Sequence, residues 1–322
     1  MRRLPDPDGT PDFLALRALK LGDLLVAVPA LHAIRRERPD HRIVLAVPGW
    51  LEPVAELVGG LDVLWPTPGL DHPLGIEPGR IDTAMNLHGN GPESRGVLEH
   101  LRPRVRLGHA SPGWDGPAWE DGVLERHRWA RLATEHGMPA DQEDVGIARP
   151  AVPSPARGAV VVHVGAFYGS RHWPVDRFAR VVEAFRADGH RVVLTGSAKE
   201  RDRALDVAAA AHWDADEVER DVLAGRIELD EMAAVVADAA LVVSVDTGAA
   251  HLASAYATPS VVLFGPAPPE EWGPPADGPH VVLTHPELRV GDTFGTECDP
   301  ALLAVQVEDV VSAGRGVLRT LD

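Results

Sequence analysis

Apolar segments of strand length alternate with amphipathic segments of helix length along the whole chain. This alternation is typical of βα units, whose strands form a parallel sheet. The predicted strands are 13–19, 42–47, 62–65, 82–86, 105–107, 159–164, 191–195, 241–244, 260–264 and 280–284. The predicted helices are 24–38, 51–57, 125–136, 175–188, 199–212, 229–237, 249–257 and 302–318. Pro29 lies early in the first helix, where we expect it to cause some distortion.

A proline-rich segment, residues 148–158 with the sequence ARPAVPSPARG, interrupts the alternation and reads as a linker. A chain of 322 residues suits two domains. We therefore predict one domain over 1–150 and a second over 151–322. Ligands of open parallel sheets bind beyond the carboxyl ends of the strands, and two such edges facing each other would enclose a pair of substrates.

The formal net charge of −17 argues against a protein that binds nucleic-acid phosphates or a broad anionic lipid surface. Cys298 is the only cysteine, which excludes an internal disulfide framework and a cysteine-rich metal site. No apolar run approaches the roughly 20 residues that span a bilayer, and the first residues do not resemble a signal peptide. These observations predict a cytoplasmic protein, with peripheral membrane contact left open.

Asp23 follows the first predicted strand, in the turn Leu-Lys-Leu-Gly-Asp at 19–23. A carboxylate at this edge of a parallel sheet can serve as a general base. Asp is equally a preferred helix N-cap, so both interpretations remain open. Gly22 permits close backbone approach and is a candidate acceptor contact.

The segment 244–251, Ser-Val-Asp-Thr-Gly-Ala-Ala-His, leads from a buried strand into a helix of small residues. The backbone N–H groups of Thr247 and Gly248 at that helix start can bind a phosphate or diphosphate. His251, one turn later, can point to the same anion. The alternative is an ordinary helix with Asp246 as its cap.

Two more segments follow strands of the second half. The loop 165–174 carries Ser170 and Arg171, and an arginine binds phosphate through a charge-assisted fork. Thr195 and Gly196 follow the next strand and either contact a nucleotide or simply turn the chain.

In the first half, the run Asn-Leu-His-Gly-Asn-Gly at 86–91 follows a strand and makes His88 and Asn90 candidate acceptor contacts. The sequence continues to Ser94 as a near match to G-x-G-x-x-G, which is a weak dinucleotide signal. The chain has 15 histidines but no H-E-x-x-H pair, so we predict no catalytic metal.

The segments ALKLGDLLVAVPALHAIRRERPDHRIVLAV, SRHWP, LTGSAKE, LAGRIELDEMAAVVADAALVVSVDTGAAHLASAYATPSVVLFGP and WGPP follow one another in this order. Together they resemble the ADP-heptose:lipopolysaccharide heptosyltransferase family, glycosyltransferase family 9. The resemblance covers roughly residues 13–275 and is weakest over 71–145. Its most specific part is the D-T-G-x-x-H-L-A run followed by P-S-V-V-L-F-G-P.

The resemblance implies an α/β protein of GT-B fold: two Rossmann-like domains face a cleft, and a final helix crosses back to the first domain. It implies inverting transfer from a nucleotide-diphosphate sugar without a metal or other cofactor. Asp23 matches the base of the acceptor domain, and Arg171 matches a cation near the donor phosphates in the nucleotide-sugar domain. The residues that match the donor motif are Asp246, Thr247, Gly248 and His251.

We therefore expect an inverting, metal-independent glycosyltransferase that moves a heptose or related sugar from a nucleotide-diphosphate donor, ADP-linked by analogy, to a hydroxyl acceptor. The acidic surface fits a small soluble acceptor or neutral glycan at least as well as a phosphorylated lipid. The alternatives are a non-catalytic nucleotide-sugar-binding protein on a GT-B frame and a GT-B-shaped nucleotide-sugar epimerase. The donor base, the sugar, the acceptor and the oligomeric state are left open.

Overall fold

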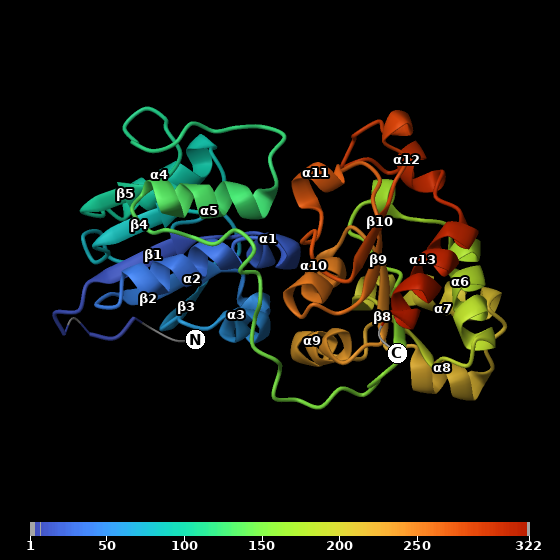
Figure 1. Ribbon diagram of the computed structural model, residues 1–322. Helices are drawn as coiled ribbons and strands as arrows, with labels where there is room; N and C mark the ends of the chain where they lie inside the picture. Colours follow the sequence, from blue (N-terminus) through green and yellow to red (C-terminus); the bar gives the residue numbers. More distant parts are fainter. Residues whose placement is uncertain (1–3, 7, 321–322) are drawn as a thin grey trace. The chain divides into compact units, whose positions relative to one another are not determined.

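The computed structural model describes residues 4–6 and 8–320, and within them ten strands form two five-stranded sheets. The chain divides into two compact units, Met1–Ala148 and Arg149–Asp322, each with its own sheet (Figure 1). The division lies two residues before the domain boundary that the linker predicted. All ten strands lie where the sequence predicted them, within a few residues at their ends.

The sheet of the first unit is parallel and has the order β3-β2-β1-β4-β5. Its strands are β1 (Asp12–Leu16), β2 (Arg42–Val47), β3 (Val63–Pro66), β4 (Thr83–Asn86) and β5 (Val105–Leu107). Strand β1 lies in the centre, where Phe13 pairs with Ile43 on one side and with Thr83 on the other. Its five residues are all buried, which explains why the four that follow Asp12 are all apolar.

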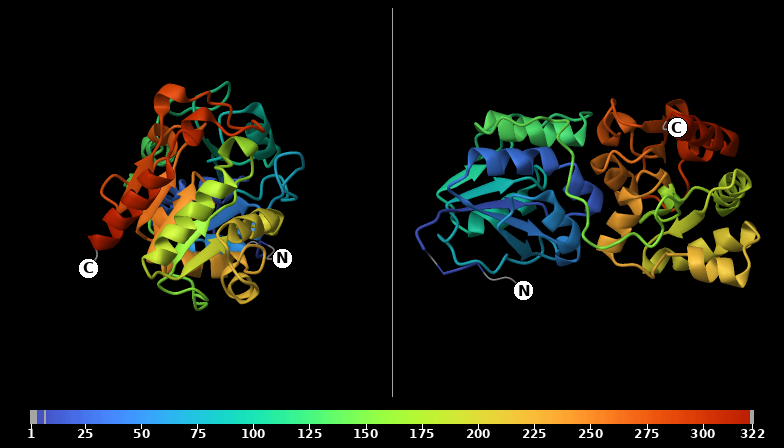
Figure 2. Two further views of the ribbon diagram at one scale, coloured as in Figure 1. Left: turned by 90° about the vertical axis from the view of Figure 1, so that its right-hand side faces the viewer. Right: turned by 60° about the horizontal axis from the view of Figure 1, so that its bottom comes forward.

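The helices of the first unit are α1 (Leu21–Leu25), α2 (Val28–Glu37), α3 (Glu52–Val58), α4 (Pro92–His100) and α5 (Glu125–Glu135). Helices α2 and α5 pack side by side (Figure 2, right). The single helix predicted over 24–38 is wrong: α1 ends at Leu25 and α2 begins at Val28. Pro29 causes the break, because it has no N–H to donate and its ring occupies the first turn of α2.

The sheet of the second unit is also parallel but has a different strand order, β10-β9-β8-β6-β7. Its strands are β6 (Val160–His163), β7 (Val192–Thr195), β8 (Leu241–Val245), β9 (Ser260–Leu263) and β10 (His280–Leu283). Its helices are α6 (Val175–Ala187), α7 (Arg201–Ala210), α8 (Ala215–Asp221), α9 (Leu229–Ala237), α10 (Gly248–Ala255), α11 (Pro269–Trp272), α12 (Pro300–Leu303) and α13 (Val307–Arg319).

The last helix packs on the sheet of its own unit, so the expected crossing of this helix to the first domain is wrong. Helix α13 lies against α6 and against β8, β9 and β10 (Figure 1). Val310 and Val317 bury its apolar face in the core of the second unit. Gly314 permits the close approach, because a Cβ there would lie 2.5 Å from Phe185 Cζ.

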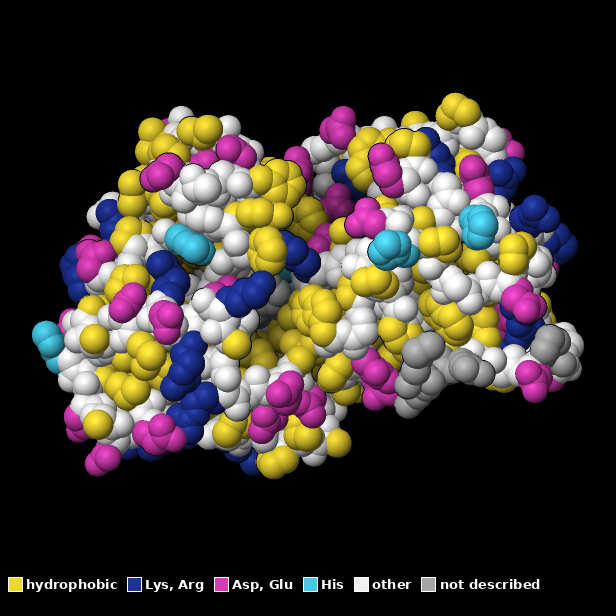
Figure 3. Space-filling model, turned by 180° about the vertical axis from the view of Figure 1, so that it is seen from behind, with side chains coloured by type: hydrophobic (Ala, Val, Ile, Leu, Met, Phe, Trp, Pro, Cys, Tyr) yellow, Lys and Arg dark blue, Asp and Glu magenta, His cyan; other side chains and the backbone are white. Residues whose placement is uncertain are grey.

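The surface carries charges of both signs. On the face seen in Figure 3, Lys and Arg side chains form small groups among Asp and Glu. Between residues 4 and 320, position 7 excepted, we find no helix with the length and hydropathy that a bilayer crossing requires.

Candidate functional site

The candidate residues follow the strands at which the strand order of each sheet reverses. In the first unit the chain passes from β1 to β2 and β3 on one side, then returns to β4 and β5 on the other. In the second unit the same reversal falls between β6 and β8. Connections leave the carboxyl ends of the strands in opposite directions at such a point and open a crevice for a ligand. Asp23 follows β1, His88 follows β4, Arg171 follows β6 and Asp246 follows β8.

Asp23 is the third residue of α1, and its two carboxylate oxygens have different neighbours. Oδ2 accepts a hydrogen bond from the backbone N–H of Lys20 at 3.1 Å, which stabilises the helix start. Oδ1 lies 3.6 Å from Nη2 of Arg17. The N-cap is Lys20, so the interpretation of Asp23 as the cap is wrong in position, although the carboxylate does serve the helix start. The side chain is 24% exposed, which leaves it open to a substrate.

Arg17 is a site residue that the sequence interpretation missed. It follows β1, is only 1% exposed, and donates through Nε to the Asp23 carbonyl at 2.8 Å and through Nη1 to the Leu87 carbonyl. Its guanidinium lies 4.5 Å from the ring centroid of Trp129. Burial lowers the pKa of Arg17, and the attraction of Asp23 opposes this shift. The available signal was a single arginine inside the apolar run 13–19.

His88 lies in the electrostatic field of the same residues. Burial, reinforced by the positive charge of Arg17 and opposed by Asp23, lowers the pKa of His88 to about 4, so the ring is neutral at pH 7. Its Nδ1 is buried and has no hydrogen-bond partner. Asn90 accepts a hydrogen bond from Arg95 through Oδ1 at 3.2 Å, and Gly22 lies within α1.

In the second unit, Arg171 and His251 both approach the carboxylate of Asp246. Nη2 of Arg171 lies 3.4 Å from Oδ2, and Nε2 of His251 lies 3.6 Å from Oδ1. The cap of α10 is Thr247, whose Oγ1 lies 2.9 Å from Oγ of Ser244. The alternative of Asp246 as an ordinary helix cap is therefore wrong: its carboxylate faces two cationic or titratable side chains.

This cluster has unused hydrogen-bonding capacity. Nε of Arg171 is buried and has no hydrogen-bond partner. The side chain of Thr247 forms no capping bond, and Gly248 has no Cβ at the first position of α10. Buried donors without partners are costly, and an anion such as a phosphate would satisfy them.

Ser170, Thr195 and Gly196 take structural positions in the second unit. Ser170 is buried and donates from Oγ to the Thr293 carbonyl at 3.2 Å. Thr195 is fully buried, with Oγ1 at 3.0 Å from Nδ1 of His163. The carbonyl of Gly196 accepts from the N–H of Gly225 at 3.0 Å. Each of these residues therefore already has a partner within the protein.

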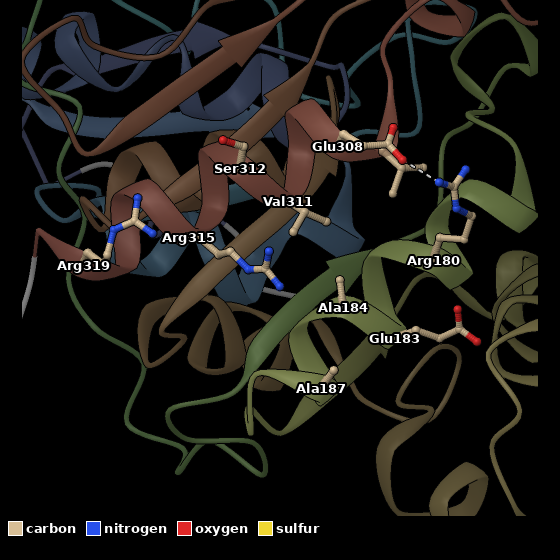
Figure 4. A pocket seen from close by; sticks show the side chains of 10 residues that line it. Arg180, Glu183, Ala184, Ala187, Glu308, Val311, Ser312, Arg315 and Arg319 are labelled. Atoms are coloured by element: carbon tan, nitrogen blue, oxygen red, sulfur yellow. Dashed lines mark hydrogen bonds and ion pairs between the residues drawn. The ribbon is translucent and has the colours of Figure 1, made fainter.

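A groove of about 700 Å³ in the second unit is separate from these residues. It lies between α6 and α13, with an apolar floor that includes Ala184 and Val311 and an ion pair between Arg180 and Glu308 at its rim (Figure 4). All of its lining residues belong to these two helices. Among the residues described, no group of three or more His, Cys, Asp or Glu side chains is arranged to hold a metal ion.

Comparison with known proteins places these features in a family. The sequence model of "Glycosyltransferase family 9 (heptosyltransferase)" matches residues 129–297, which is more than half of the chain. The chain belongs to glycosyltransferase family 9. The matched region contains Arg171, Asp246 and His251 but begins after Asp23.

Individual relatives are heptosyltransferases. Lipopolysaccharide heptosyltransferase 1 of Pseudomonas aeruginosa is 34% identical over 157 residues, which are 47% of this chain and 42% of that protein. The chain thus spans about two fifths of the length of the first relatives that it matches. A longer match, 26% identical over 291 residues, covers 80% of this chain and 89% of lipopolysaccharide heptosyltransferase 1 of Salmonella typhimurium.

The same fold occurs in solved structures of the family. The E. coli ADP-heptose lipopolysaccharide heptosyltransferase II superposes with a TM-score of 0.76 at 19% identity, over 96% of this chain and 99% of that one. The two parallel-sheet α/β units are thus the Rossmann-like domains of a GT-B protein, as the sequence predicted.

Proposed function

We propose that this member of family 9 is an inverting glycosyltransferase that moves a heptose or related sugar from an ADP-linked donor to a hydroxyl acceptor. The observation that carries the proposal is the approach of Arg171 and His251 to Asp246 beside the start of α10. A leaving diphosphate needs cations and N–H donors of this kind. The names of the heptosyltransferase relatives support the choice of donor.

In the proposed reaction Asp23 accepts the proton of the acceptor hydroxyl. The freed oxygen attacks the anomeric carbon of the donor sugar, and the bond from that carbon to the phosphate oxygen breaks. The diphosphate departs with the bonding electron pair, and its charge is stabilised by Arg171, His251 and the N–H groups of Thr247 and Gly248. A single displacement inverts the anomeric configuration, and no metal is required by this scheme.

We infer that the acceptor is a small soluble molecule or a neutral glycan and that the reaction takes place in the cytoplasm. The net charge of −17 supports this choice, because such a chain repels a phosphorylated, anionic lipid surface. In this proposal the first unit binds the acceptor, with Gly22, His88 and Asn90 as contacts. The second unit binds the donor.

A mass-spectrometric screen of nucleotide sugars tests the donor. We expect ADP-linked heptoses to bind and to be hydrolysed slowly or transferred, and an absence of binding to all ADP-linked sugars would contradict the proposal. Sugar inversion without an acceptor would instead indicate an epimerase.

Asp23→Asn tests the base. We expect this variant to lose transfer while donor binding, measured by calorimetry, stays largely intact. Asp71→Asn removes an exposed carboxylate from the same unit and serves as the matched control. Turnover of Asp23→Asn equal to that of the control would remove Asp23 from the mechanism.

A further inference from the structure

Arg17 is a buried cation near the carboxyl ends of the paired strands β1 and β4, where the connections that follow them diverge. Its Nε and Nη1 donate to the carbonyls of Asp23 and Leu87, which belong to the connections that leave these two strands. The guanidinium therefore links the two connections that border the crevice of the first unit. Its remaining nitrogen, Nη2, forms no hydrogen bond and lies 3.6 Å from Oδ1 of Asp23.

The orientation of the guanidinium is itself fixed. One face stacks on Trp129, whose centroid is 4.5 Å away. The indole of Trp129 is held in turn, because Nε1 donates to Oε2 of Glu125 at 3.0 Å. Glu125 also accepts from Nε of Arg128 at 2.7 Å. The plane of the Arg17 fork is thus set by α5, a helix distant in sequence from Asp23.

Burying a charged arginine is costly, and a neutral side chain of similar size would avoid that cost. Two of the contacts of Arg17 involve Asp23: its Nε donates to the Asp23 main-chain carbonyl, and its Nη2 faces the Asp23 carboxylate. These two contacts fix where α1 begins relative to β1 and the direction in which the Asp23 carboxylate points.

We propose that Arg17 is a positioning residue for Asp23. Its Nε anchors the Asp23 main chain and its guanidinium lies beside the carboxylate, so Arg17 fixes the direction of the carboxylate without touching the substrate. This inference rests on the proposed function, because it requires Asp23 to be the base. A displacement of about 1 Å at a reacting group can lower a rate by roughly 100-fold.

The test compares Arg17→Gln and Arg17→Lys with the wild-type protein. We expect Arg17→Gln to lower kcat by about 100-fold and to leave the donor Kd within about twofold. Arg17→Lys keeps the charge but loses the planar fork, so we expect a loss of about tenfold in kcat. A folded Arg17→Gln variant with wild-type kcat overturns the inference. If Arg17→Gln does not fold, wild-type kcat in Arg17→Lys overturns it.

Arg42→Gln is the matched control. Arg42 is also a buried arginine beside β1, but it pairs with Asp12 at the opposite end of the strand. We expect it to lower the midpoint of thermal unfolding and to leave kcat within about twofold. An equal loss of kcat in Arg42→Gln and Arg17→Gln would show that the loss reflects general destabilisation of the unit. That result would overturn the positioning role.

A double-mutant cycle on stability separates this inference from the proposed function. We expect Arg17→Gln and Asp23→Asn to lower the free energy of urea unfolding less than additively, because the two side chains interact. Additive effects overturn the positioning role whatever the activity is. Full turnover in Asp23→Asn, by contrast, contradicts the base assignment in the proposed function.

Discussion

The guanidinium of Arg171 lies 3.4 Å from the carboxylate of Asp246, although 75 positions separate the two residues in the chain. They meet because β6 and β8 are neighbours in the sheet and both connections leave at its carboxyl edge. Asp246 is also within reach of His251, so the carboxylate orients two side chains that can bind an anion.

Arg171→Ala should weaken the binding of ADP by about 10- to 100-fold, because a hydrogen bond to a charged group contributes roughly 1.5–3 kcal/mol. Isothermal titration calorimetry with free ADP measures this directly. Arg180→Ala is the control, because Arg180 is an exposed arginine of the same unit whose ion pair is with Glu308. Equal affinity in Arg171→Ala and the control would remove Arg171 from the donor site.

The sequence predicted the sheets well because parallel strands are buried on both faces. Residues 42–47 and 241–245, for example, are all buried, and their apolar runs contain no polar alternation. Once the strands are located, the segments that leave their carboxyl ends follow, and Asp23, Arg171 and Asp246 lie in these segments. The placement of these three residues at the carboxyl edges of the sheets therefore follows from the sheet topology alone.

Contacts between distant segments could not be predicted in this way. Ser170 resembled a phosphate ligand, but its hydroxyl binds the Thr293 carbonyl, and the sequence holds no sign of that pairing. Arg17 lies inside the predicted strand 13–19 and was assigned no role, yet it contacts Trp129 more than a hundred positions later. Helix α4 was not predicted, because its buried residues are Ser94 and Leu98, and a single buried apolar residue gives no helical periodicity in the sequence.

Gly169→Ala should destabilise the second unit. A Cβ at residue 169 would lie 1.9 Å from the carbonyl oxygen of Thr296, so the two loops must separate. Overpacking of this kind costs about 1–3 kcal/mol, measurable by urea unfolding. Gly96→Ala is the control: Gly96 lies inside α4 with open space around its Cβ, so alanine should stabilise by roughly 0.5–1 kcal/mol. A Gly169→Ala variant as stable as the wild type would show that the loops are not in close contact.

His280 should make stability depend on pH. Burial lowers the pKa of His280 from its usual 6.5 to about 4, and its Nδ1 lies 2.9 Å from Oγ of Ser260. The unfolded chain therefore binds a proton between pH 6.5 and 4 that the folded chain does not. The stabilisation is complete above pH 6.5 and is lost as the pH falls through this window, with a slope of at most about 1.4 kcal/mol per pH unit from this one group.

Unfolding free energies of His280→Gln, measured from pH 4 to 7.5, should accordingly fall less steeply than those of the wild type. His88 and His109 also have pKa values lowered to about 4 by burial, so a residual dependence of the same sign should remain. His285→Gln is the control, because the His285 side chain is 40% exposed. Parallel curves for His280→Gln and the wild type would contradict the prediction.

Asp12→Asn should lower the stability of the first unit substantially. The Asp12 side chain is fully buried at the start of β1, where Oδ1 lies 3.1 Å from Arg42 and Oδ2 lies 2.8 Å from Arg80. Burial raises the pKa of Asp12, while both arginines act in the opposite direction. The variant removes the carboxylate that pairs with the largely buried Arg80, while Arg42 keeps its ion pair with Asp8 at 2.8 Å, so we expect a cost at the lower end of about 3–5 kcal/mol.

The matched control for Asp12→Asn is Asp188→Asn, which breaks an ion pair of similar geometry on the surface. Asp188 lies 2.7 Å from Nε of Arg315, but water reaches both side chains and screens their attraction. We therefore expect Asp188→Asn to change the urea midpoint far less than Asp12→Asn does. Equal changes in the two variants would contradict the prediction, because Asp12 is both more deeply buried and paired with two arginines rather than one.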